Sequence, residues 1–124
     1  MKRLLFAFIF ITSAIPCFAA TFYVDGASLG GVCSDSNNGT ALTTPFCTLS
    51  RGMAVAVAGD TGNVRTATYN SGTTFFSPAN SGTVASPITF QNYLNETPTL
   101  TRTATSDETN YVIDTNARSH LIIR

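Results

Sequence analysis

The sequence predicts a mainly β protein built from short strands, and two observations lead to this class. The region after residue 19 is rich in Thr, Asn, Ser and Gly, and only 11% of the chain is Asp, Glu, Lys or Arg. This composition is unlike that of long helices, which need Ala, Leu, Glu and Lys, and it suits turns and β-branched strands. In addition, short strand-like runs are separated by turn-forming dipeptides, which are Asn38-Gly39, Ser71-Gly72, Ser77-Pro78, Ser81-Gly82 and Ser86-Pro87.

The first 19 residues have the three parts of a secretory signal peptide. Lys2 and Arg3 give a positive start, Leu4–Ile11 is an apolar run, and the triplet Cys17–Ala19 is a small-x-small cleavage site. The apolar run is too short for a transmembrane helix, and Pro16 soon follows it. We therefore expect export of the chain and no insertion into the membrane after cleavage.

The predicted organisation is a signal peptide at residues 1–19 and an exported domain at residues 20–124. We expect the mature protein in the periplasm, in the extracellular space or at the cell surface. A lipid anchor on Cys17 is the competing interpretation, and the proline directly before this cysteine disfavours it.

The exported domain carries little charge. Removal of Lys2 and Arg3 leaves seven acidic residues and five basic ones, a formal net charge of −2. No lysine remains, and the arginines are scattered without interleaved aromatic residues, which excludes the basic footprint of a nucleic-acid-binding protein and the basic patch of a membrane-surface protein. The arginines are Arg51, Arg65, Arg102, Arg118 and Arg124.

Two cysteines, Cys33 and Cys47, remain once Cys17 leaves with the signal peptide. An oxidising compartment favours a disulfide between them. A loop of this size is worth roughly 3 kcal/mol in the chain-entropy account. A metal site, which needs more ligands, and two free thiols are the alternatives.

One short amphipathic helix is predicted to begin near the end of this loop, just before Cys47. Thr44 can accept as its N-cap, and Pro45 suits the first turn because its fixed φ fits a helix and its missing N–H is not needed there. Gly59 is expected to end the helix. An ordinary helix of a small mixed domain is the alternative interpretation. The apolar stripe is made of Leu49, Met53 and Val57, with Phe46 and Ala56 nearby.

Four motifs follow one another in this region. They are the polar turn Ser34–Thr40, the helix start Pro45–Leu49, the corner Gly59–Thr61 and the strand Val64–Tyr69. This order resembles the N-terminal segment of secreted right-handed parallel β-helix proteins, which include pectate-lyase-like and chondroitinase-B-like polysaccharide lyases. The resemblance implies an N-terminal helical cap followed by the first coils of a parallel β-helix.

Three positions depart from the pattern of these proteins. Gly62 and Asn63 stand where β-branched or apolar residues are usual, and Ala67 replaces a glycine. Because Gly and Asn are poor strand formers, the first strand is expected to be short or irregular.

Further strands are expected along the rest of the chain. The 24 residues from Ile88 to Val112 are close to one coil of such a helix. Only about one and a half coils can be counted, so we expect the front part of a longer protein; a complete small β-rich domain closed by the disulfide is the alternative. The expected strands are Thr74–Phe76, Pro87–Phe90, Thr99–Thr101, Tyr111–Ile113 and His120–Ile123, and the expected core is Phe46, Leu49, Met53, Val57, Val64, Ile88, Phe90, Val112, Ile113, Leu121 and Ile122.

No residue is predicted to be catalytic or to bind a metal. The loop that starts at Asp35 lacks the spacing of an EF-hand, so we expect a self-capping turn. Asp107, Glu108 and Asp114 form the densest acidic group. Asp107 and Glu108 are adjacent in a Thr/Ser-rich stretch, so we expect a solvated loop in which their side chains point apart. His120 is the single histidine and is expected at a strand start.

The resemblance implies that the whole protein acts on or binds polysaccharide, as a lyase on acidic glycans. Such lyases use a Lys or Arg base and usually a calcium ion, in coils beyond this chain, so we expect no cofactor in this segment and no activity from it. The alternative is a non-catalytic β-helix that serves as an adhesin or a carbohydrate-binding surface protein.

Overall fold

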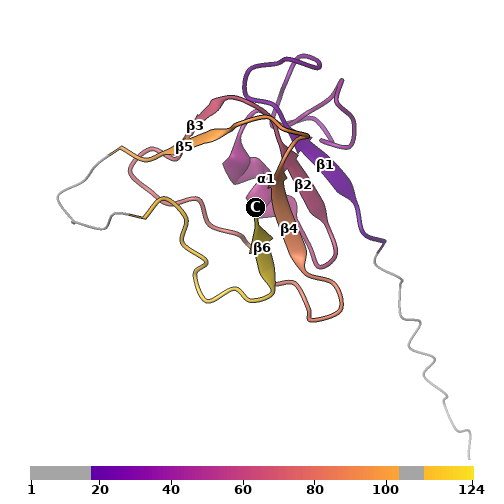
Figure 1. Cartoon of the computed structure of the whole chain (residues 1–124), viewed down its shortest axis with the longest axis vertical. Helices are drawn as coiled ribbons and strands as arrows, with labels where there is room; N and C mark the ends of the chain where they lie inside the picture. The colour runs from indigo at the N-terminus through magenta and orange to yellow at the C-terminus, as the bar shows by residue number, and fades with distance from the viewer. Residues whose placement is uncertain (1–17, 104–110) are drawn as a thin grey trace, which may run out of the picture.

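The structure is a computed structural model, and it describes residues 18–103 and 111–124. One short helix and several short strands follow one another in the described residues (Figure 1). They are β1 (Thr21–Val24), α1 (Leu49–Val55), β2 (Thr61–Val64), β3 (Thr68–Asn70), β4 (Ile88–Asn92), β5 (Thr99–Thr101) and β6 (Leu121–Ile123).

Every strand pair in the described residues is parallel. The larger sheet has the order β1-β2-β4-β6, and a second sheet pairs β3 with β5. A third contact is a parallel bridge between Phe76 and Ile113. The mainly β class with parallel sheets is therefore confirmed, and the antiparallel hairpins that would contradict it are not found among these residues.

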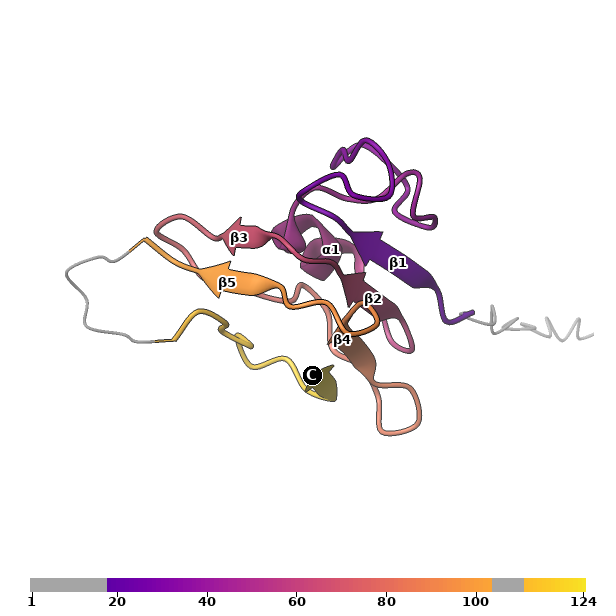
Figure 2. The ribbon, with the colours of Figure 1, turned by 45° about the horizontal axis from the view of Figure 1, so that its top comes forward.

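The chain visits the two sheets and the Phe76–Ile113 bridge in the same order on two successive circuits. From β2 it passes through β3 and Phe76 to β4, and from β4 it passes through β5 and Ile113 to β6. Figure 2 shows the result: β1, β2, β4 and β6 succeed one another across the molecule, with β5 beside β3 on a separate face. Segments one circuit apart thus lie side by side.

The core lies between these ladders and α1. Buried side chains come from the inner faces of the strands, and α1 adds Leu49 and Met53. The rings of Phe22 in β1 and Phe90 in β4 meet across β2 with centroids 5.9 Å apart. They can do so because position 62 between them is glycine: a Cβ there would lie 2.6 Å from the Phe22 ring. The strand β2 is short, as expected, but it is regular and paired along both edges.

The predicted start of the helix is wrong. The N-cap is Thr48, whose Oγ1 accepts a hydrogen bond from Arg51 N at 3.1 Å, and Thr44 and Pro45 precede the helix. Phe46, also outside the helix, forms a parallel bridge with Val24 of β1. This pairing keeps the backbone extended before residue 48, so Thr48 and not Thr44 caps the helix.

The predicted end of the helix is also wrong. The helix ends at Val55, with Ala56 as the C-cap, and Gly59 adopts its positive φ of 94° in the following turn. Val57 therefore leaves the apolar stripe and is 39% exposed, whereas Ala56 is buried.

Several strand predictions are confirmed and several need correction. The strands β4, β5 and β6 lie where they were expected, whereas β1 was not anticipated. The predicted strand Val64–Tyr69 is divided by a corner that separates β2 from β3. Phe76 and Ile113 contribute a single bridge and not full strands.

The predicted repeat of 24 residues is wrong. Ile88 pairs with Leu121, whereas the carbonyl of Val112 accepts a hydrogen bond from Phe76 N, beside the Phe76–Ile113 bridge. Of the predicted core, Ile122 is 39% exposed because it alternates with the inward Leu121. The remaining predicted core residues are buried or pack against the core: Phe46, Leu49, Met53, Val64, Ile88, Phe90, Val112, Ile113 and Leu121.

Candidate functional site

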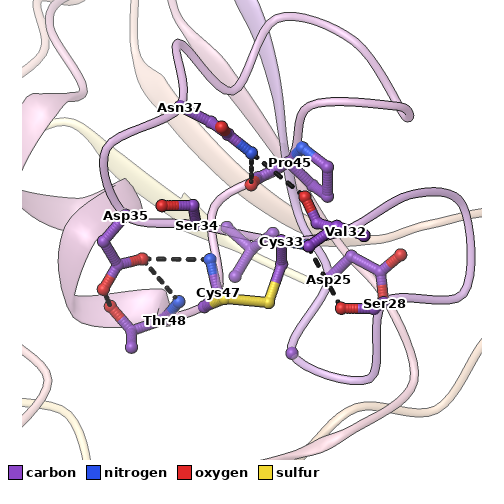
Figure 3. The surroundings of a disulfide bond; sticks show 12 residues. Asp25, Ser28, Val32, Cys33, Ser34, Asp35, Asn37, Pro45, Cys47 and Thr48 are labelled. Atoms are coloured by element: carbon purple, nitrogen blue, oxygen red, sulfur yellow. Dashed lines mark hydrogen bonds between the residues drawn. A yellow bond between two sulfur atoms is a disulfide. The ribbon is translucent and has the colours of Figure 1, made fainter.

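The predicted disulfide between Cys33 and Cys47 is present, with a Cα–Cα distance of 4.8 Å (Figure 3). It fastens the loop before α1 to the residue that precedes the N-cap. The metal and free-thiol alternatives for this pair are thereby set aside.

Asp35 in the same loop has a structural role. Its Oδ1 accepts hydrogen bonds from the backbone N–H groups of Cys47 at 3.0 Å and Thr48 at 2.9 Å. Its Oδ2 accepts one from the Thr48 hydroxyl at 2.7 Å. Figure 3 shows this carboxylate turned toward the start of α1. The predicted self-capping turn is thus corrected in detail, because the carboxylate caps a partner 13 residues away.

A cluster of charged side chains joins β1, β2 and the loop after β4. Arg65 lies between two carboxylates, with NH1 3.3 Å from Asp25 Oδ2 and NH2 2.6 Å from Glu96 Oε1. The Asp25 side chain is fully buried, and those of Arg65 and Glu96 are 15% and 21% exposed. Glu96 also accepts from Thr66 N at 2.7 Å.

The proton affinities in this cluster follow from these contacts. The hydrogen bond to Glu96 is the main cause that raises the pKa of Arg65, and the same bond is the main cause that lowers the pKa of Glu96. An arginine base would have to lose a proton, so this arrangement opposes such a role for Arg65.

Tyr69 lies on the inner side of the corner between β2 and β3. Its hydroxyl lies 2.9 Å from the Arg65 carbonyl and 3.1 Å from the Val24 carbonyl, and it accepts from Gly26 N at 3.2 Å. Burial is the main cause that raises the pKa of Tyr69. The neutral phenol therefore acts as a hydrogen-bonded link between β1 and the corner after β2.

The outer face of the larger sheet carries a band of polar and aromatic side chains. Successive residues of a strand point to opposite faces, so Tyr23 faces outward between the buried Phe22 and Val24. In register with it stand Asn63 of β2 and Gln91 of β4, whose Nε2 donates to Asn63 Oδ1 at 3.0 Å. We call the set Tyr23, Asn63, Gln91, Tyr93 and Arg124 the outward band; Asn63, in its middle, is covered by its neighbours and only 8% exposed.

Contacts across strands hold the outward band in place. Arg124 donates from Nε to Gln91 Oε1 at 3.1 Å. The rings of Tyr23 and Tyr93 meet edge to face with centroids 5.8 Å apart, and the Arg65 guanidinium carbon lies 5.2 Å from the Tyr93 centroid. Aromatic faces, side-chain amides and a guanidinium are the groups that can pack on a sugar ring and bind hydroxyl and carboxylate oxygens.

A partly open cavity of about 300 Å³ lies beside the core, and Gln91 and Arg124 of the outward band also line it. Its wall is mainly apolar and comes from α1, β2, β4, β5 and the end of β6. This chemistry suits the packing of apolar side chains and not the binding of a polyol. The apolar lining includes Leu49, Met53, Val64, Phe90, Leu100 and Ile123.

The structure does not gather the other acidic and basic candidates of the sequence into a site. Asp107 and Glu108 lie outside the described residues. Asp114 Oδ1 accepts from Asn116 N at 2.8 Å, which is a local turn, and the exposed His120 contacts Ser119.

No metal role is derived for this segment. Within residues 18–103 and 111–124, no three Cys, His, Asp or Glu side chains are placed to hold a metal ion. Asp25 and Glu96 both bind the Arg65 guanidinium, and a cation held between them is a poor fit for calcium. In the same residues, no helix is long and apolar enough to cross a membrane.

Sequence reasoning missed the residues of the outward band and the Asp25–Arg65–Glu96 cluster. The alternating run Thr-Phe-Tyr-Val-Asp at residues 21–25 is the signal that could have revealed β1, with Tyr23 outward. Nothing local marks Glu96 as the partner of an arginine 31 residues earlier.

The sequence matches no protein-family model and no curated protein. Among solved structures, the chain is similar to one described as a rhamnogalacturonan lyase, with a TM-score of 0.55 and 21% sequence identity. The match covers 86% of this chain and 27% of that chain, so this chain spans about a quarter of the length of the lyase. At this identity the likeness concerns the fold: the chain has a fold related to part of a polysaccharide lyase.

Proposed function

We propose that this chain is the capped N-terminal part of an exported right-handed parallel β-helix protein that binds acidic polysaccharide. Three features support the architecture: two parallel sheets and the Phe76–Ile113 bridge are visited in a fixed order, α1 packs against β1, and the fold is similar to part of a polysaccharide lyase. Right-handed crossovers are the rule for parallel strands of one sheet.

The outward band is the observation that carries the binding proposal. It presents two tyrosine rings beside an amide ladder that ends in the exposed Arg124. The tyrosines give flat apolar surface to a sugar ring, and the guanidinium gives two parallel N–H donors to a uronate carboxylate. A row of strands lets an extended glycan lie across several circuits.

Two activities of the whole protein are compatible with this surface. The first is a lyase on acidic glycans, whose base and metal ligands would lie in other coils. The second is a non-catalytic adhesin or carbohydrate-binding surface protein. The pairing of Arg65 with two carboxylates favours a binding role for this segment itself, since an arginine held in two ion pairs is a poor base.

A binding assay with the exported chain tests the proposal. Immobilised rhamnogalacturonan, pectate, alginate and chondroitin should retain the protein more strongly than a neutral glycan. Tyr23→Ala and Arg124→Gln should each weaken retention about fivefold, on the order of 1 kcal/mol. The control is Val84→Ala, which truncates a side chain 86% exposed in a loop away from the band.

The same samples report on catalysis. We expect no rise in the absorbance of unsaturated uronate from any of the four glycans. Equal retention on charged and neutral glycans, or variants that bind like the control, would reject the binding proposal.

A further inference from the structure

Asp60 is a buried carboxylate at the corner before β2, with 5% of its surface exposed. Its Oδ1 accepts a hydrogen bond from Ala20 N at 2.8 Å, and its Oδ2 accepts one from Val57 N at 2.9 Å. The backbone of Asp60 is held as well, because its N–H donates to Val57 O and its carbonyl accepts from Thr89 N. The carboxylate is therefore fixed in a position that faces Ala20.

Both side-chain contacts of Asp60 are to backbone amides. The ion pairs found within residues 18–103 and 111–124 involve Asp25 and Glu96. The negative charge of a carboxylate already strengthens its bonds to backbone N–H groups, and a positively charged donor would add the attraction between two opposite charges at a site where water is largely excluded. A positive charge on the Ala20 nitrogen would supply such a donor without any movement of the backbone.

The sequence puts the predicted cleavage site next to this nitrogen. The triplet Cys17–Ala19 predicts cleavage between Ala19 and Ala20. Phe18 is 84% exposed and Ala19 and Ala20 are exposed, so this bond lies at the surface directly before β1. Ala20 is already in register with β2, since its carbonyl accepts from Thr61 N at 2.9 Å.

We propose that the chain is cleaved after Ala19 and that the new α-ammonium group of Ala20 is bound by Asp60. Hydrolysis by a signal peptidase breaks the Ala19–Ala20 amide bond; water supplies the oxygen of the Ala19 carboxylate, and the Ala20 nitrogen ends as an ammonium group. The neutral N–H donor of the precursor thus becomes a charged donor at the same place. This ion pair ties the first residue of the mature protein to the corner that precedes β2.

The site is selective for one N-terminus. Cleavage one residue later would remove Ala20 and leave Asp60 without this donor. Retention of Ala19 would leave a neutral amide there. The inference is independent of glycan binding, and either can fail without the other.

The composition of the chain offers a direct test. Lys2 is the only lysine, so the mature protein has a single primary amine, the α-amino group of its first residue. The exported protein is purified, its N-terminal residue is identified, and the rate of reaction with an amine-acylating reagent is followed by intact mass. We expect an Ala20 start and a reaction about fivefold slower than in the Asp60→Asn variant.

Controls separate the ion pair from general effects on the fold. Asp35→Asn changes another structural carboxylate, at the start of α1, and should react like the wild type. If Asp60→Asn does not fold, the wild-type chain labelled in denaturant is the reference, and the native protein should again react about fivefold more slowly.

A thermodynamic cycle gives a second readout. Asp60→Asn should lower the folding equilibrium constant about fivefold more in the chain that starts at Ala20 than in one that retains Ala19. A start at Thr21, equal labelling rates in the native and denatured protein, or the same effect of the variant in both chains would overturn the proposal.

Discussion

Position 62 illustrates how one residue can contradict a local rule and still favour the fold. Glycine is a poor strand former, yet here it lies in β2 with partners on both edges. Its lack of a side chain lets Phe22 and Phe90 meet above it. The loss in strand propensity is offset by contact between two aromatic rings in the core.

Gly62→Ala should therefore destabilise the protein, although alanine is the better strand former. A Cβ would lie 2.6 Å from the Phe22 ring and 3.0 Å from the Phe90 ring, so we expect a loss of about 1–3 kcal/mol in the free energy of unfolding. Phe22→Leu in the same chain should recover part of this loss because it removes the clashing ring. Denaturant unfolding measures both, and an alanine variant as stable as the wild type would contradict this packing.

Glu96 makes a prediction about acid stability. Its folded-state pKa is lowered, first by the hydrogen bond from Arg65, so its stabilising contribution is present above the ordinary value near 4.5 and is lost as pH falls through the folded-state value. Glu96→Gln should lower stability by about 1 kcal/mol at neutral pH, and the difference should vanish in acid.

The control for Glu96 is Tyr69→Phe, which leaves the ion pair with Arg65 in place. It should lower stability by an amount that does not change between neutral and acidic pH, because the phenol stays neutral there. A difference for Glu96→Gln that is constant from neutral to acidic pH would contradict the ion pair.

At the scale of the elements, the loop before α1 is held by a covalent bond and by a carboxylate. The disulfide and the Asp35 carboxylate fix it at adjacent positions, Cys47 and Thr48. Together they place the N-cap and hence the start of the helix.

Replacement of both Cys33 and Cys47 by serine should cost roughly 3 kcal/mol of stability, as expected for a loop of this size. Alkylation of the exported, denatured wild-type protein should find no free thiol before reduction and two after it. Two thiols that react without a reductant would show that the bridge does not form.

The sequence predicted β4, β5, β6 and the disulfide because their signals are local: short β-branched runs between turns, and a single cysteine pair. It misplaced the helix because Thr44-Pro45 has the residues of a helix start, whereas the observed start at Thr48 depends on Asp35 and on pairing of Phe46 with Val24. The length of a circuit was misjudged for a related reason. Loops of unequal length separate the ladders, so the partner of Ile88 is known only from the folded chain.

At the scale of the whole molecule, parallel pairing determines which side chains form a surface. Tyr23, Asn63 and Gln91 are far apart in the sequence and become neighbours only because β1, β2 and β4 are in register. The outward band could therefore not be read from the sequence. It combines the paired rings of Tyr23 and Tyr93 with two side-chain amides and the guanidinium of Arg124.

The central claim is that this band binds acidic glycan, and a titration followed by backbone amide chemical shifts tests it most directly. Isotope-labelled mature chain is titrated with an oligogalacturonide. We predict saturable changes that are largest at Tyr23, Asn63, Gln91 and Tyr93 and that disappear in Tyr23→Ala. Saturable changes confined to β3 and β5, or none at all, would contradict the claim.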